Sequence, residues 1–143
     1  MNETQLQSIG AAVLRVSLGV ILLAHSLYLK LVVFSLAGTA GYFESIGLPG
    51  SLAYLTFSVE VAAGIALIVG YQVRIAALLV IPFLLGATWV HASNGWLFSN
   101  ANGGWEYPLF LAIAAITQVF IGGGMGASVD SVVRRISAVP ANA

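Results

Sequence analysis

The sequence predicts an all-α fold, an integral membrane four-helix bundle that forms a single domain, and two observations support this prediction. Of the 143 residues, 59% are hydrophobic and only 7% are charged, whereas a soluble domain needs about a quarter of its residues charged. Four apolar segments also approach the length of about 20 residues that a helix needs to cross a bilayer. Barrel strands need only about 10 residues, so helices are the structures that satisfy the backbone of such segments in lipid.

The four expected helices follow one another along most of the chain. They cover residues 9–34, 52–70, 73–92 and 107–122. Pro82 lies midway along the third segment, where its ring removes a backbone donor and predicts a kink. Small residues between Ala62 and Ala66 predict that a neighbouring backbone approaches the second helix closely.

The connections between these helices differ in length. A tight turn, YQVR, joins the second helix to the third, whereas residues 37–51 and 93–106 form longer connections rich in Gly, Asn, Ser and aromatic residues. Binding residues are frequent on such loops because a rigid scaffold positions them. We therefore expect the two long loops to carry a lid or a docking surface.

Positively charged residues near the helix ends predict the orientation in the membrane. Arg74 lies in the short turn, and Arg134 and Arg135 follow the last helix, whereas the two long loops contain no Lys or Arg. Lys30 opposes this trend, but a lysine near a helix end can extend its ammonium group to the interface. The N-terminal MNETQLQ has no base and lacks the positive region of a signal peptide. We expect a multi-pass protein of the inner (plasma) membrane with both termini in the cytoplasm.

Charge and cysteine content exclude several classes of function. The formal net charge is zero and the chain has no cysteine. A neutral chain offers no basic surface for nucleic acid, so the expected contacts are the lipid bilayer and other proteins. Without cysteine the chain cannot form thiol relays, thiolate metal sites or disulfides.

Glu60 lies in the middle of an apolar run, FSVEVAAGIALIVG, which spans residues 57–70. A charged residue at the centre of a lone membrane helix costs about 2.5–3.5 kcal/mol on insertion scales, so a partner is expected. Arg15 on the first helix lies at a similar depth, and we expect a structural ion pair between Arg15 and Glu60. The alternative is that Glu60 accepts a proton during a reaction, and the sequence leaves both roles open.

Further polar and aromatic residues gather near the helix ends that carry the long loops. The candidate catalytic residues, which can exchange protons, are Glu60, His91, Glu106 and His25. The candidate cofactor-binding residues are Lys30, Trp89, Trp105 and Tyr107. The aromatic residues among them also fit an interfacial belt. No metal site is expected, because the Glu-x-x-His pairs of di-metal bundles are missing from the sequence.

Four motifs resemble those of a known family. GYFESIGLP, EVAAGIALIVGYQVR, VHASNGW and GGWEYPLFL occur in this order over nearly the whole chain, and they closely resemble the DoxX family of small four-helix membrane proteins. The stretch HSLYLK departs from the family pattern, in which a His-Gly pair is commonly followed by a Lys. His25 and Lys30 are retained, but Ser26 stands where Gly is usual.

The resemblance implies an integral membrane protein of respiratory or redox chemistry. Family members are associated with quinone-coupled sulfur oxidation and with the detoxification of oxidants or quinone-like compounds, often beside a partner protein. The resemblance therefore favours a quinone-interacting subunit of an oxidoreductase complex, with quinone as the suspected cofactor and a partner protein as the second electron carrier.

Two other functions remain open. The chain could be a non-catalytic membrane anchor or structural subunit that docks a larger enzyme. It could also be a haem-b cytochrome with His25 and His91 as axial ligands. Haem b is the least favoured, because two histidines in a four-helix protein often coincide in depth by chance. Homo-oligomerisation is compatible with each function.

Overall fold

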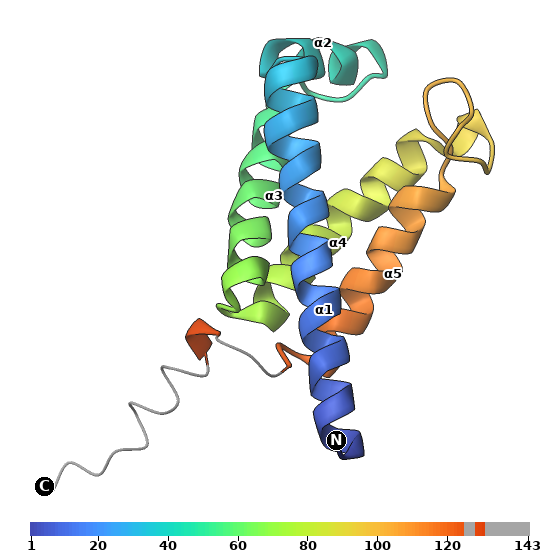
Figure 1. Cartoon of the computed structure of the whole chain (residues 1–143). Coiled ribbons are helices and arrows are strands. Elements are labelled where there is room, and N and C mark those ends of the chain that lie inside the picture. Colours follow the sequence, from blue (N-terminus) through green and yellow to red (C-terminus); the bar gives the residue numbers. More distant parts are fainter. Residues whose placement is uncertain (125–127, 131–143) are drawn as a thin grey trace, which may run out of the picture.

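Helices form most of the chain that the structure, a computed structural model, describes, namely residues 1–124 and 128–130 (Figure 1). In order they are α1 (Glu3–Leu23), the π-helical segment η1 (Ala24–Val33), α2 (Leu36–Ser45), α3 (Ser51–Val69), α4 (Val73–Val90), the 3-10 turn η2 (Ala92–Asn94) and α5 (Glu106–Ile121). The described residues contain no strand. The predicted all-α fold is therefore confirmed.

Three helical segments are long and apolar enough to cross a membrane. They are Glu3–Val33, Ser51–Val69 and Val73–Val90, and the shorter α5 is also apolar. Large apolar side chains on these helices face outward, for example Leu78 and Phe120, which are 57% and 76% exposed. Such side chains are stable only against lipid or another apolar surface. The chain is a membrane protein, and its helical bundle contacts the bilayer.

These three segments and the shorter α5 pack as two pairs. α1 with η1 lies mainly along α3, and α4 lies mainly along α5. In Figure 1 the α4–α5 pair leans away from the α1–α3 pair toward the end of the bundle that carries α2. We call this end, with α2 and residues 91–105, the loop end. The opposite end, with the α3–α4 turn at residues 70–72 and the close of α5, is the turn end.

The boundaries of the helices differ from the predictions in two places. α1 begins at Glu3 rather than near residue 9, because Asn2 and Gln5 form a capping box with bonds of 2.9 and 3.0 Å. The loop expected at residues 37–51 contains α2, so that expectation was wrong over Leu36–Ser45. Glycines at positions 38 and 41 weaken the helix propensity of this stretch, and packing of α2 on α3 and η1 compensates.

Glycine contacts join α1 to α3. A Cβ atom on Gly19 would lie 2.7 Å from the carbonyl oxygen of Gly64, and one on Gly64 would lie 3.1 Å from the carbonyl oxygen of Gly19. The close approach expected from the small residues of α3 is thus present at Gly64. The adjoining core contains Leu18, Leu22, Ala63, Leu67, Val73, Ala77, Val80, Leu84, Leu111, Ala112 and Ala115. Pro82 lies inside α4, which continues to Val90.

Candidate functional site

A buried polar cluster ties η1 to α3 near the loop end. The Ser26 hydroxyl donates to Oε2 of Glu60 at 2.5 Å, and the Lys30 ammonium donates to the same oxygen. Ser26 is fully buried, and Glu60 is only 7% exposed. Ser26 and Lys30 are four residues apart, so the helical segment presents both to α3. The carboxylate of Glu60 is therefore paired and hydrogen-bonded inside the bundle.

The expected ion pair between Arg15 and Glu60 is wrong. Arg15 is buried, but its Nη1 atom donates to the carbonyl oxygen of Ile68 at 3.3 Å. Ile68 lies eight residues beyond Glu60, or about 12 Å further along α3 toward the turn end. Side chains on a helix point back toward its N-terminus, so the long Lys30 side chain reaches down from η1 to Glu60. Lys30, which the sequence analysis placed at the interface, is the partner.

A second polar group joins η1 to the beginning of α5. The rings of His25 and Tyr107 stack with their centroids 5.6 Å apart and an interplanar angle of 26°. Nδ1 of His25 lies 3.0 Å from the carbonyl oxygen of Ile21. A ring nitrogen that bonds a carbonyl carries the hydrogen, so Nε2 of neutral His25 is a proton acceptor. The π-helical form of η1 is itself common at functional sites of helices.

The α4–α5 loop folds back on its own backbone. Oε1 of Glu106 accepts from the Phe98 amide at 2.9 Å, and Trp96 packs edge-to-face on Trp105 with centroids 4.5 Å apart. A Cβ atom on Gly104 would collide with the carbonyl oxygens of Trp96 and Leu97. The tight path of the loop therefore requires glycine at position 104, and it fixes Glu106 at the first turn of α5.

This loop and α5 border an open groove of about 390 Å³, which we call the loop-end groove. Its lining consists of Trp96, Phe98, Glu106, Tyr107, Leu109, Phe110 and Ile113, and it is almost wholly apolar. Phe110 and Ile113 are 65% and 52% exposed on the lipid-facing side of α5. A flat apolar molecule dissolved in the bilayer could therefore reach Glu106 and Tyr107 from the side.

The structure separates the predicted site residues into three places. Glu106 and Tyr107 line the loop-end groove, and His25 stacks on Tyr107. Trp105 packs edge-to-face on Trp96, which is another residue of the groove lining. Glu60 and Lys30 form the buried cluster with Ser26. His91 bonds the carbonyl oxygen of Ala87 at 2.7 Å and lies beside Gly103, while Trp89 is 65% exposed on α4. The two histidines thus have different neighbours, and their roles stay predictions.

The sequence analysis missed six residues of these sites, namely Ser26 of the buried cluster and Trp96, Phe98, Leu109, Phe110 and Ile113 of the groove lining. Ser26 was noted only as a departure from the usual Gly, and its hydroxyl proves to be a partner of Glu60. Phe98 and Phe110 line the groove but look like ordinary loop and lipid-facing residues in the sequence. The departure at Ser26 was a usable signal, because a polar residue on an apolar helix needs a partner.

Comparisons with known proteins agree with the four motifs. The DoxX family profile matches residues 10–93, which is more than half of the chain. A protein of Bacillus subtilis (strain 168) named "Putative oxidoreductase CatD" is 35% identical over 79 residues, which are 55% of this chain and 57% of that protein. The chain thus spans little more than half the length of this relative, and no solved structure matches it. The resemblance read from the sequence is confirmed, and the chain belongs to the DoxX family.

Proposed function

We propose that the chain is the membrane component of a redox system and that it binds a quinone ring in the loop-end groove. The observation that carries this proposal is the groove itself, in which an aromatic, apolar lining holds two side chains that can form hydrogen bonds to a ring oxygen, Glu106 and Tyr107. Flat ring compounds bind well among aromatic side chains with a few polar groups at hand. The similarity to a protein named as an oxidoreductase supports the same reaction class.

The residues around the groove suit proton exchange. A quinol that becomes a quinone releases two electrons and two protons, so the site has to accept protons. In its neutral form His25 offers Nε2 as an acceptor, and its stacking on Tyr107 holds the imidazole next to the groove. Glu106 supplies a carboxylate at the groove wall, with Oε1 already held by the Phe98 amide. We assign His25 and Glu106 as the two proton acceptors and Tyr107 as the residue that orients the imidazole.

The two electrons pass to a partner protein in this proposal. The chain has no cysteine with which to hold an iron–sulfur cluster or to form a thiol relay. The α4–α5 loop exposes three large apolar side chains at the rim of the groove, namely Trp96, Leu97 and Phe98, which are 52%, 53% and 68% exposed, and the first and last of these also line it. Aromatic residues of this kind are enriched at protein interfaces. They support the docking of an electron carrier close to the bound ring.

Glu60 has a positioning role in this proposal. Both hydrogen bonds to its side chain come from η1, and Ser26 is the neighbour of His25 in the chain. Loss of the cluster would free η1 from α3 and move the imidazole relative to Tyr107. Glu60 therefore affects the reaction through His25 rather than by contact with the ring.

The proposed orientation places the loop end outside the inner membrane and the turn end in the cytoplasm. Arg74 lies at the turn end, whereas α2, residues 46–50 and residues 91–105 contain no Lys or Arg. An excess of positive residues marks the cytoplasmic side. Bound quinone would then lie near the outer leaflet.

The test is equilibrium binding of decylubiquinone to the full chain in nanodiscs, followed through tryptophan fluorescence. Phe110→Ala and Phe120→Ala form a matched pair, because both are exposed phenylalanines of α5 and only Phe110 belongs to the groove lining. We expect Phe110→Ala to weaken binding about tenfold, since an aromatic contact is removed, and Phe120→Ala to leave it unchanged. Equal effects of the two substitutions on the affinity for decylubiquinone would show that the quinone does not bind in the loop-end groove.

A membrane anchor is the second candidate, and the exposed apolar tip of the α4–α5 loop is the observation that favours it. Under this alternative the loop docks an enzyme, and the chain itself carries no proton. Co-purification separates the two functions. The anchor function predicts that Trp96→Ser abolishes co-purification of the partner. It also predicts that the partner keeps full turnover when it is bound to the His25→Ala or the Glu106→Gln variant, and this result would contradict the redox role.

A further inference from the structure

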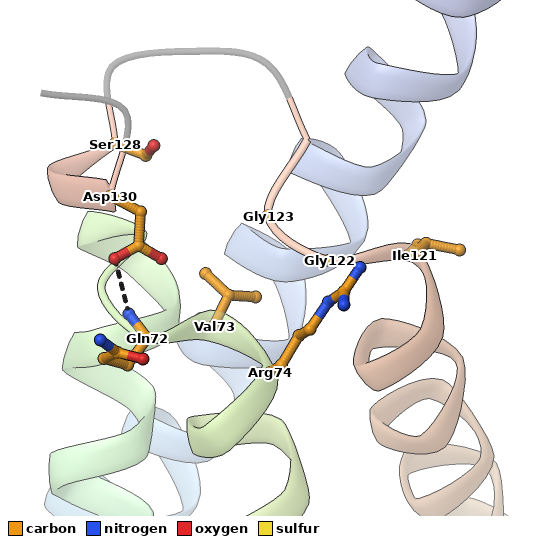
Figure 2. A pocket seen from close by; sticks show the side chains of 8 residues that line it. All are labelled: Gln72, Val73, Arg74, Ile121, Gly122, Gly123, Ser128 and Asp130. Carbon is orange, nitrogen blue, oxygen red and sulfur yellow. Dashed lines mark hydrogen bonds between the residues drawn. The ribbon is translucent and has the colours of Figure 1, made fainter. Parts of the chain in front are cut away.

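The turn end contains a second cavity, of about 400 Å³, which the proposed function does not use. Its lining comes from the α3–α4 turn, the first turn of α4, the end of α5 and residues 128–130 (Figure 2). The lining residues are Gln72, Val73, Arg74, Ile121, Gly122, Gly123, Ser128 and Asp130. Polar atoms make up most of its surface, so its natural occupant is a polar or charged group.

Arg74 is the cation at one side of this cavity. A Cβ atom on Gly122 would lie 3.3 Å from Nε and 3.4 Å from Nη2 of Arg74, so the guanidinium lies across this glycine (Figure 2). Gly122 has a φ of 73°, which a side chain would strain. Arg74 is solvent-exposed, and no carboxylate of residues 1–124 or 128–130 lies within ion-pair distance of it. Its charge is therefore available to a ligand.

Asp130 lies at the other side of the cavity, and its charge is already balanced. Oδ1 of Asp130 accepts from the Gln72 amide at 3.1 Å, and the carboxylate interacts electrostatically with the buried guanidinium of Arg15. Figure 2 shows Asp130 directed to Gln72 and Arg74 directed to Gly122, with Val73 between them. Among residues 1–124 and 128–130, Arg15, Asp130 and Arg74 together leave one positive charge at the cavity. An anion is the ligand that this balance attracts.

The cavity lies where the helices leave the apolar layer. α3 ends at Val69, α4 begins at Val73 and α5 ends at Ile121. Exposed apolar residues adjoin it on the helices, namely Ile75 at 54% and Phe120 at 76%. A phosphate at this level has acyl chains directly below it when it belongs to a lipid. The planar guanidinium of an arginine can donate two parallel hydrogen bonds to the oxygens of one phosphate, whereas a lysine ammonium acts only as a point charge.

We infer that the turn-end cavity binds a phosphate group, with Arg74 as its charged contact. The phosphate belongs either to an anionic phospholipid head group or to a soluble phosphate, and both share the same chemistry at Arg74. This site is independent of the loop-end groove. A bound phospholipid would fix the turn end in the membrane interface, and a soluble phosphate would bind from the aqueous side.

The experiment is native mass spectrometry of the delipidated full chain titrated with dioleoylphosphatidylglycerol, with and without inorganic phosphate. We expect Arg74→Gln to weaken lipid binding about tenfold, because a charge-assisted contact is lost. Retention of the lipid in millimolar inorganic phosphate identifies the head group as the ligand. Displacement of the lipid, together with binding of inorganic phosphate alone that Arg74→Gln abolishes, identifies a soluble phosphate.

Asp130→Asn is the matched control, because it changes a charge of opposite sign in the same cavity. We expect it to bind phosphatidylglycerol as tightly as the natural chain or more tightly. Equal binding by the natural chain and Arg74→Gln would overturn the inference, and so would a loss in Asp130→Asn as large as in Arg74→Gln. If Arg74→Gln does not fold, Arg74→Lys decides: binding several-fold weaker supports the bidentate contact, and unchanged binding contradicts it.

Discussion

The loop end and the turn end each contain a cavity of nearly the same volume, about 390 and 400 Å³, but with opposite linings. Aromatic and aliphatic side chains line the loop-end groove, whereas an arginine, an aspartate and glycines line the turn-end cavity. Volume alone therefore does not indicate the ligand. The chemistry of the lining does, and it points to a flat ring at one end and to an anion at the other.

The two ends also accommodate a buried charge in different ways. At the loop end Glu60 receives an ammonium group and a hydroxyl from η1. At the turn end Arg15 donates to a backbone carbonyl and interacts with Asp130, and its Nε has no hydrogen-bond partner among the described residues. Removing one partner of a buried ion pair is strongly destabilising because it leaves an uncompensated charge. We therefore expect substitutions at the Glu60 cluster to cost more stability than those around Arg15.

The largest expected effect is at the loop end. Lys30→Met leaves the Glu60 carboxylate buried without its cation, and we expect it to lower the free energy of unfolding by about 3–5 kcal/mol. Denaturant titration in detergent measures this. Adding Glu60→Gln to Lys30→Met should restore most of the loss, because no buried charge then remains. A double variant as unstable as Lys30→Met would show that the pair does not behave as an ion pair.

A smaller effect is expected at the turn end from Gly70→Ala. Gly70 has a φ of 72°, and a Cβ atom there would collide with the Arg15 guanidinium and with Ser128. We expect a loss of about 2–3 kcal/mol in the free energy of unfolding, from backbone strain and displacement of Arg15. Gly47→Ala is the control, because Gly47 has a φ of 82° and open space at its Cβ. If both variants lose the same stability, Arg15 contributes nothing at this turn.

Ser26→Ala tests how much the Ser26 hydroxyl contributes to stability, at a position where the family pattern usually has Gly. The buried hydrogen bond to the Glu60 carboxylate disappears, and we expect a loss of about 1.5 kcal/mol in the free energy of unfolding. Ser58→Ala is the matched control, since exposed Ser58 bonds only the Tyr54 carbonyl of its own helix. The same denaturant titration compares them. A Ser26→Ala variant as stable as Ser58→Ala would mean that Lys30 alone holds Glu60.

The smallest expected effect concerns the wall of the loop-end groove. Glu106→Leu removes the acceptor of the Phe98 amide and should destabilise the loop by about 1 kcal/mol. Amide hydrogen exchange at Phe98 should then be about fivefold faster, because that free energy corresponds to a change of this size. Glu106→Gln retains an acceptor oxygen and should exchange nearly as the natural chain does. Unaltered exchange in Glu106→Leu would contradict the anchoring of the loop by Glu106.

The candidate site could be predicted from the sequence in its composition but not in its pairings. Helix rise converts sequence position into depth, so the sequence placed His25, Glu106 and Tyr107 at one end of the bundle, where the structure also has them, and their roles stay predictions. Depth leaves the rotation of each helix and the reach of each side chain undetermined. For that reason Glu60 was paired with Arg15 instead of Lys30, and Phe98 and Phe110 were not recognised as groove residues.

The sequence by itself determined the class of protein, the all-α fold and the family. Apolar runs of this length are stable only as membrane helices, and this depends on local composition rather than on contacts. Tertiary structure alone decided that residues 36–45 form α2, that Ser26 and Lys30 share one oxygen of Glu60, and that the two ends enclose cavities of opposite character. Each of these depends on which helix faces lie together, which hydropathy does not encode.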